Sequence, residues 1–246
     1  MITQVPGKIY LADQRGTVET SGFRRQSTFN FGAFQSEHKE PFGRLYALNE
    51  ETLAGGHTVE FAVAQDSYIV LLPITGGVEF STTGGGASGT AEVEQIVNLA
   101  VPAGTTLHLR NPFAPDELVS VLHLWLHAPP LPAPAVALTT VFGQLLEEQE
   151  NELLEVIGFA AVPDQAPAFT RALPFALRLG RFMGRQETMY QVQQPGNSLF
   201  AFIIAGAFEL EGRLLHEKDG VALWEVKEIE LEALSNHALV LVLELA

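Results

Sequence analysis

Residues 68–80 read "YIVLLPITGGVEF", a run of aromatic and β-branched residues that leads through two glycines into a second short apolar alternation. Residues of this kind favour strands, and glycine supplies the backbone freedom that a tight turn between strands needs. Residues 200–212, "FAFIIAGAFELEG", repeat the order of strand, glycine turn and strand, with Gly206 at the position of Gly76. The pattern predicts a hairpin that occurs twice in the chain.

Period-two apolar segments extend outward from both copies of the hairpin. They include "HTVEFAVA" (57–64), "LHLRN" (107–111), "VSVLHLWLH" (119–127) and "ALVLVLEL" (238–245), each bounded by turn-forming residues. Short segments with this alternation predict β-strands. Residues 99–126 and 221–245 also run parallel in pattern, each with a turn-bounded strand, a loop and a strongly apolar strand. The sequence therefore predicts an all-β fold built from two similar barrels or sandwiches.

One stretch breaks the strand pattern. In "TTVFGQLLEEQENELLEV" (139–156) the apolar residues have helical spacing over acidic ones, and the proline-rich "HAPPLPAPAVA" (127–137) precedes it as a connector. The first part predicts a short helix, while "NELLEVIGF" (151–159) is compatible with a strand. We expect one domain over 1–135, a linker with the helix over 136–165, and a second domain over 166–246.

Composition limits the function. The chain has 246 residues and a formal net charge of −15, and its 14 Lys and Arg form no basic stripe, so direct binding to nucleic acid or to a membrane surface is not expected. It has no cysteine, which leaves His and carboxylates as the available metal ligands. No apolar run has membrane-spanning length and no export signal is visible, so a cytoplasmic location is expected.

Taken in order, several motifs resemble the pirin-like bicupins, a branch of the cupin superfamily that includes quercetinase-like proteins. The motifs are "LADQRGTVETSGFRRQSTFNFGAF" (11–34), "FGRLYALNEETLAGG" (42–56), "DSYIVLLPITGGVEF" (66–80), "GRFMGRQETMYQV" (180–192) and "GAFELEGRLLHEKDGVALWE" (206–225). The resemblance implies two cupin barrels. It also implies one metal, usually iron, held by three histidines and a glutamate in the N-terminal barrel, where quercetinase-like members open a flavonol ring with dioxygen.

The expected ligands are replaced in this chain. Alignment on Asp66 and Gly76 puts Ala62 and Ala64 at the first two histidine positions and Tyr68 at the general cupin glutamate. In "PAGTTLHLRN" (102–111), Leu107 takes the third histidine position, and His108 comes one residue late. Since successive strand residues face opposite sides, His108 leaves the barrel interior unless a bulge brings it back. We therefore expect the N-terminal metal site to be lost.

The remaining polar residues leave alternatives open. Glu60 shares its strand parity with Ala62, so it is either a displaced interior ligand or a surface carboxylate. Tyr68 either donates a hydrogen bond into the cavity or fills space as an aromatic. His123 and Trp125 lie on one face of their strand; if that face points inward, they line a pocket with Tyr68 and Glu60, and otherwise they are structural.

Two functions follow from the resemblance and its departures. The preferred one is a bicupin without a catalytic metal or cofactor that binds a small molecule or a protein partner. The alternative is a quercetinase-like dioxygenase that holds iron or another divalent first-row metal in a rearranged site of Glu60, His108 and His123.

Overall fold

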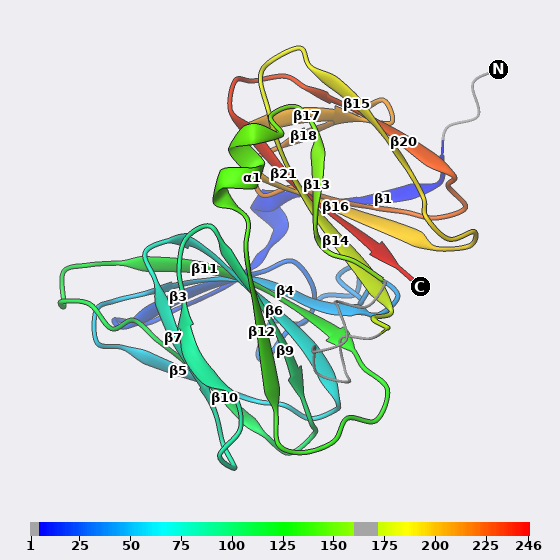
Figure 1. Ribbon diagram of the computed structural model, residues 1–246. Helices are drawn as coiled ribbons and strands as arrows, with labels where there is room; N and C mark the ends of the chain where they lie inside the picture. The colour runs from blue at the N-terminus through cyan, green and yellow to red at the C-terminus, as the bar shows by residue number, and fades with distance from the viewer. Residues whose placement is uncertain (1–4, 160–171) are drawn as a thin grey trace. The chain divides into compact units, whose positions relative to one another are not determined.

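The computed structural model describes residues 5–159 and 172–246 of the chain. The described residues of Arg15–Phe142 form one compact unit, called here the N-terminal unit. The residues up to Gln14, together with those of Gly143–Ala246, form the other, called the C-terminal unit. Each unit consists of two β-sheets, in agreement with the predicted all-β fold (Figure 1).

Some strands of the N-terminal unit arise from the predicted period-two segments at 57–64, 68–80, 107–111 and 119–127, and others lie outside them. The strands of this unit are β2 (Gly16–Glu19), β3 (Phe23–Ser27), β4 (Leu45–Leu53), β5 (Thr58–Ala62), β6 (Ser67–Thr75), β7 (Val78–Thr82), β8 (Ser88–Ala91), β9 (Gln95–Val101), β10 (Thr106–Arg110), β11 (Val119–His127) and β12 (Val136–Val141). Among the described residues they pair in the orders β12-β9-β6-β11-β4-β3-β2 and β5-β10-β7-β8.

The C-terminal unit repeats this plan. Its elements are β1 (Gly7–Tyr10), a 3-10 turn η1 (Ala12–Gln14), α1 (Gly143–Glu148), β13 (Leu153–Ile157), β14 (Phe175–Phe182), β15 (Glu187–Gln191), β16 (Ser198–Ala205), β17 (Ala207–Leu210), β18 (Arg213–His216), β19 (Gly220–Leu223), β20 (Glu228–Ala233) and β21 (Ala238–Leu245). The strand orders, within the described part of the chain, are β1-β19-β16-β21-β14-β13 and β15-β20-β17-β18.

The duplicated hairpin explains the two equivalent glycines. Gly76 lies between β6 and β7 with a φ of 68°, and Gly206 lies between β16 and β17 with a φ of 78°. A Cβ atom on Gly76 would come within 2.7 Å of the Val119 side chain, and one on Gly206 within 2.4 Å of Ser235 Oγ. Both turns therefore require glycine, because the backbone is left-handed there and because neighbouring side chains leave no room for a Cβ atom.

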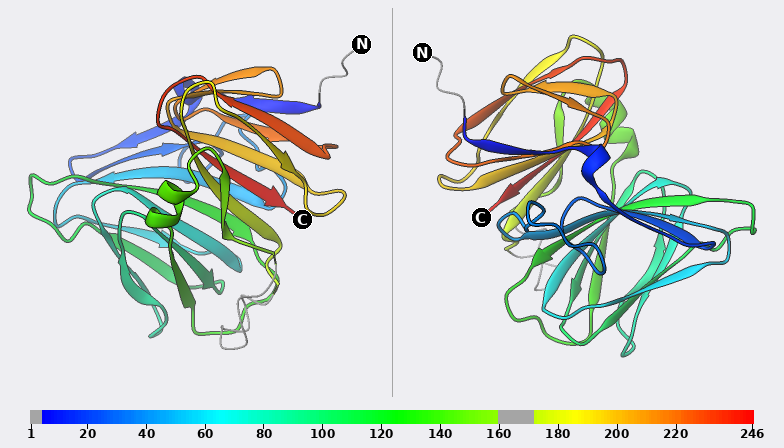
Figure 2. Two further views of the ribbon diagram at one scale, coloured as in Figure 1. Left: turned by 45° about the horizontal axis from the view of Figure 1, so that its top comes forward. Right: turned by 180° about the vertical axis from the view of Figure 1, so that it is seen from behind.

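The domain boundaries differ from the predicted ones. β1 lies inside the predicted first domain, 1–135, but pairs antiparallel with β19 of the C-terminal unit, and Figure 2 shows this blue strand among the orange and red ones. β12 falls in the predicted linker, 136–165, but extends the N-terminal sheet beside β9. The predicted short helix is present as α1, and β13 follows it as a strand. Residues 160–171, which include the predicted start of the second domain, lie outside the described residues.

Each unit has its own apolar core between its two sheets. The N-terminal core includes Leu53, Phe61, Leu71, Leu107 and Trp125, and the C-terminal core includes Phe182, Phe208, Leu231 and Val242. Because residues of alternate parity on each strand reach this core, core membership shows which side chains face the barrel interior. Within the described residues, no helix has the length and apolar composition needed to cross a membrane.

Candidate functional site

The inner face of β5 is formed by its large apolar residues. Val59 and Phe61, with Val63 just beyond the strand, are buried in the core, whereas Glu60, Ala62 and Ala64 are exposed. The predicted inward positions of Ala62 and Ala64 were therefore wrong, and of the two alternatives for Glu60 the structure has the surface carboxylate. The prediction counted residues backward from Gly76 through β6 and into β5. The turn at 63–66 interrupts the alternation of inward and outward side chains, so the alternation in β6 does not predict the one in β5.

β10 keeps the parity predicted for Leu107. Leu107 and Leu109 are fully buried in the N-terminal core. Neither ladder of β10 contains a register shift, so no bulge turns His108 inward. His108 instead faces outward with its Nε2 atom 3.5 Å from a carboxylate oxygen of Glu60, and lines an open surface groove of about 640 Å³.

Tyr68 does not reach the barrel interior either. On β6 the core contains Ile69 and Leu71, so Tyr68 lies on the other face of the sheet, where it is buried. Burial raises the pKa of its hydroxyl group, and the charge of Arg44 opposes this rise. Of the two alternatives for Tyr68, the structure has the buried aromatic and not the pocket residue, because the inward parity of β6 is that of Ser67 and Ile69.

His123 and Trp125 of β11 do face the interior, where they meet two residues from neighbouring strands. His123 is fully buried, and its Nε2 atom lies 3.2 Å from Oε1 of Glu51 on β4. The same carboxylate oxygen accepts a hydrogen bond from Nε of Arg25 on β3, whose Cα pairs with that of Glu51. Trp125 Nε1 donates to His123 Nδ1 at 2.6 Å. Arg25, Glu51, His123 and Trp125 form a continuous chain of hydrogen bonds, called here the interior polar chain.

The interior polar chain fixes the state of the histidine. An indole N–H can only donate, so His123 Nδ1 must accept, and the ring proton of the neutral imidazole resides on Nε2, from which it is donated to Glu51. Burial lowers the pKa of His123, the hydrogen bond to Glu51 and its charge oppose this, and Arg25 adds to the lowering. His123 is therefore neutral, and the fixed charges of the chain are those of Arg25 and Glu51.

This protonation state predicts a dependence of stability on pH. The folded pKa of His123 lies below its unfolded value, so between pH 7.5 and 5.5 the unfolded state gains a proton that the folded state does not take up. The free energy of unfolding should fall by about 1 kcal/mol over this range through His123 alone. Urea unfolding should show that His123→Gln loses this component, while the exposed His216→Gln keeps it. Equal slopes for wild type and His123→Gln would contradict the assignment.

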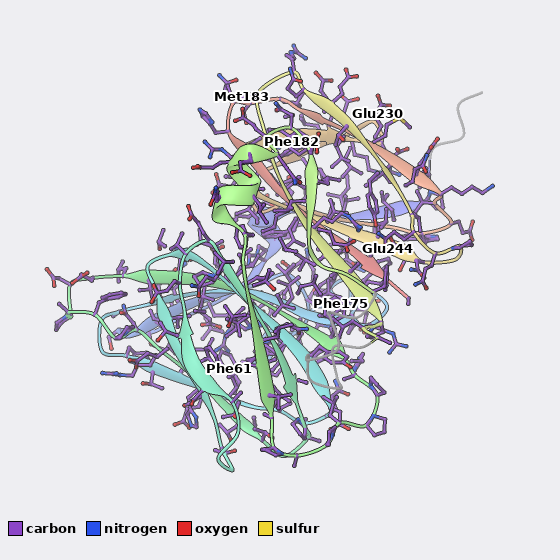
Figure 3. The ribbon with its side chains drawn as sticks, viewed as in Figure 1. Phe61, Phe175, Phe182, Met183, Glu230 and Glu244 are labelled. Atoms are coloured by element: carbon purple, nitrogen blue, oxygen red, sulfur yellow. The ribbon has the colours of Figure 1, made fainter. Side chains whose placement is uncertain are left out.

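Aromatic rings surround the interior polar chain. The centroid of the Phe61 ring lies 5.1 Å from that of His123 and 5.7 Å from that of Trp125, and Figure 3 shows Phe61 among the strands of the N-terminal unit. Phe31, from the loop between β3 and β4, lies 5.8 Å from Trp125. The guanidinium carbon of Arg25 is 4.8 Å from the Phe61 centroid and 5.2 Å from that of Phe31, within cation–π range.

Asn49 completes the polar part of this interior. It lies on β4 two residues before Glu51, on the same face, and its Cα pairs with that of His123. Asn49 is fully buried, yet its Oδ1 and Nδ2 atoms have no hydrogen-bond partner among the described residues, and neither has Oε2 of Glu51. Three hydrogen-bonding atoms therefore face the barrel interior without a partner.

Sequence reasoning missed Arg25, Asn49, Glu51 and Phe61. A signal was present in "LYALNEETL" (45–53), because Asn49 and Glu51 share their parity with Ala47 and Leu53, which are apolar. A polar pair inside an apolar period-two series indicates a buried hydrogen-bonded group.

The side chains do not fit the metal site of four ligands that the resemblance implies. The inward residues of β5 and β10 are Val59, Phe61, Leu107 and Leu109, none of which carries a ligating atom. Over the described ranges, 5–159 and 172–246, no three His, Asp or Glu side chains gather as a metal would require. The predicted rearranged site of Glu60, His108 and His123 does not form, because Glu60 and His108 face outward and His123 faces inward.

The C-terminal barrel also contains a buried carboxylate, but a saturated one. Glu244 on β21 accepts hydrogen bonds from the Tyr190 hydroxyl, from the backbone N–H groups of Gln193 and Gln194, and from Asn197 Nδ2. Burial, together with Glu244, raises the pKa of Tyr190, which therefore remains a donor. Arg178 Nη1 donates to the same hydroxyl at 2.6 Å. This network anchors the loop between β15 and β16.

Comparisons with known proteins agree with this architecture. Residues 175–245 match the family model described as the quercetinase C-terminal cupin domain. No curated protein matches the sequence.

Solved structures match nearly the whole chain at low sequence identity. YhhW from Escherichia coli is 15% identical, with a TM-score of 0.80 and 98% of each chain covered. A second structure of YhhW, a bacterial pirin in complex with nickel(II), is 16% identical with a TM-score of 0.77, covering 98% of this chain and 99% of that one. Quercetin 2,3-dioxygenase from Acinetobacter baumannii is 17% identical with a TM-score of 0.72, covering 98% of this chain and 86% of that one.

The fold of the whole chain is similar to that of the solved structures, and part of its C-terminal unit matches a cupin family model. The two units are built on one plan, the solved structures with that plan include a bacterial pirin and a quercetin dioxygenase, and the C-terminal match is to a quercetinase cupin domain. The whole chain therefore has the two-unit fold of these solved structures, and residues 175–245 match the quercetinase C-terminal cupin domain.

Proposed function

We propose that this protein is a pirin-like bicupin and acts as a metal-independent small-molecule-binding protein, with its binding site in the N-terminal barrel. One observation carries the proposal: the barrel interior combines apolar side chains at the strands where the metal ligands were expected with the unpartnered atoms of Asn49 and Glu51. A dry apolar interior gains nothing from buried polar atoms without partners, whereas a binding site uses them to orient a ligand.

The same observation favours a small molecule over a protein partner. The unpartnered atoms belong to side chains with 0% exposure inside the barrel, where a folded partner does not reach. Dioxygenase chemistry has no support from the donor set, since His123 already uses both ring nitrogens in hydrogen bonds to Glu51 and Trp125.

Metal analysis and a quercetin assay test the proposed function. Protein purified without chelator and then incubated with nickel(II) or iron(II) should retain far less than one equivalent of metal after desalting, and should not consume quercetin in air. The bacterial pirin YhhW, which has been solved with nickel(II), is the control for metal retention. One equivalent of retained metal, or metal-dependent loss of quercetin, would refute the proposal.

A further inference from the structure

Arg25 offers unused hydrogen-bond donors beside the interior polar chain. Its Nε atom donates to Glu51, and the described structure gives its two Nη groups no hydrogen-bond partner. A guanidinium has five N–H donors, so four remain for another group. The side chain is 14% exposed, whereas that of Glu51 is 0% exposed. Arg25 is therefore the member of the chain that a molecule entering the barrel meets first.

Glu51 and Asn49 provide acceptors deeper in the same interior. Glu51 Oε2 accepts no hydrogen bond, and neither Oδ1 nor Nδ2 of Asn49 is bonded. Leaving buried polar atoms unpaired costs free energy, and native proteins rarely do so without a functional reason. Glu51 Oε2 and Asn49 Oδ1 are both hydrogen-bond acceptors, so a ligand must bring a donor to bond with them. A hydroxyl group is such a donor.

The buried carboxylate of the C-terminal barrel, in contrast, has its hydrogen-bond partners. There Glu244 has all its bonding capacity taken by Tyr190, Asn197 and the backbone of 193–194. Among the described residues, the buried side-chain atoms without a hydrogen-bond partner all belong to the N-terminal unit. Asn98 of β9 lies on the face opposite the core residues Val97 and Leu99, so in the described barrel interior such atoms belong to Asn49 and Glu51. These two side chains distinguish the N-terminal interior from the C-terminal one.

The chemistry of the free groups selects the ligand. Two Nη groups of one guanidinium match the two oxygens of a carboxylate, and the rings of Phe23, Phe31 and Phe61 around Arg25 keep water from weakening that pair. Because Phe61 and Trp125 fill much of the interior, the remainder of the ligand must be small.

We propose that the N-terminal barrel binds a small hydroxycarboxylate, with its carboxylate on the Nη groups of Arg25 and its hydroxyl group donating to Asn49 Oδ1. This inference rests on the proposed function, whose ligand class it specifies. Ligand efficiency limits a molecule with five non-hydrogen atoms to a Kd no lower than about 3 µM.

Glycolate is the probe, and Trp125 is the reporter. The chain has two tryptophans, and a Trp224→Phe background leaves only Trp125, whose N–H is bonded within the interior polar chain. Glycolate should change its fluorescence saturably and give heat in calorimetry. Acetate, which lacks the hydroxyl group, should bind about tenfold more weakly, and uncharged glycolamide at least tenfold more weakly.

Variants separate the site from general effects. Arg25→Lys should weaken glycolate binding at least tenfold, since a point charge does not reproduce the fork. Asn49→Leu should weaken binding to a similar degree while the protein stays folded, which keeps the test valid if Arg25→Lys unfolds. Arg110→Gln, on the outer face where Arg110 pairs with Glu79 at 2.8 Å, is the matched control and should bind glycolate as the wild type does.

The outcomes distinguish this inference from the proposed function. No saturable binding of glycolate, or equal binding by wild type and Asn49→Leu, overturns the hydroxycarboxylate assignment even if the protein retains no metal and leaves quercetin intact. Retained metal or quercetin consumption overturns the proposed function itself, and this inference with it.

Discussion

Asn49→Leu should raise the free energy of unfolding of the N-terminal unit, while Asn111→Leu should lower it. Both asparagines are fully buried, but their amides differ in bonding. Asn111 Nδ2 donates to the carbonyls of Leu53 and Glu117, at 2.9 and 2.8 Å, and its Oδ1 accepts from the N–H of Phe113 at 2.9 Å. Asn49 makes no side-chain hydrogen bond among the described residues.

The magnitudes follow from what each substitution leaves behind. Leucine at position 111 leaves three backbone groups without a hydrogen-bond partner, which should lower the free energy of unfolding by about 2–4 kcal/mol. Leucine at 49 removes two unpaired buried atoms and adds apolar contact, so unfolding should require about 1–2 kcal/mol more. Urea titration followed by Trp125 fluorescence in the Trp224→Phe background measures both. If Asn49→Leu destabilises the unit as much as Asn111→Leu, the amide of Asn49 is bonded in the folded protein and the site argument fails.

Glu244→Ala should destabilise the C-terminal unit by about 3–5 kcal/mol. The substitution leaves the Tyr190 hydroxyl, the Asn197 amide and the N–H groups of Gln193 and Gln194 without their acceptor. Glu244 is 1% exposed, so water does not replace the carboxylate readily.

Two matched variants show whether the network causes this effect. Glu244→Gln keeps the shape and one acceptor oxygen, so it should cost less than the alanine variant. Glu230→Ala, at an exposed position on β20, should change the free energy of unfolding by less than about 0.5 kcal/mol; Figure 3 labels both glutamates. Trp224 fluorescence in a Trp125→Phe background follows the C-terminal unit. A Glu244→Ala effect as small as that of Glu230→Ala would mean that the loop does not depend on the carboxylate.

Much of the fold follows from local pattern. The strands within 68–80 and 200–212 were predictable because alternation and glycine turns act over a few residues, and the repeat of these signals identified the duplication. The inward position of Leu107 was predictable for the same reason, since parity holds along one continuous strand.

The site itself was less predictable. Parity is lost across the turn at 63–66, so Ala62 was assigned inward in place of Phe61. The ion pair of Arg25 with Glu51 depends on which strands become neighbours and in which register, and a single sequence does not give that pairing. The outward position of His108 beside Glu60 could be predicted from the sequence, because a regular strand without a bulge places His108 on the face opposite Leu107.

The pairing of β1 with β19 has a consequence for synthesis on the ribosome. Tyr10 emerges about 210 residues before its partner Gly220. At usual elongation rates this interval is on the order of 10–40 s, during which the whole N-terminal unit can fold. β1 therefore lacks its partner strand until β19 has been synthesised, so the sheet of the C-terminal unit is completed only after most of the chain has emerged.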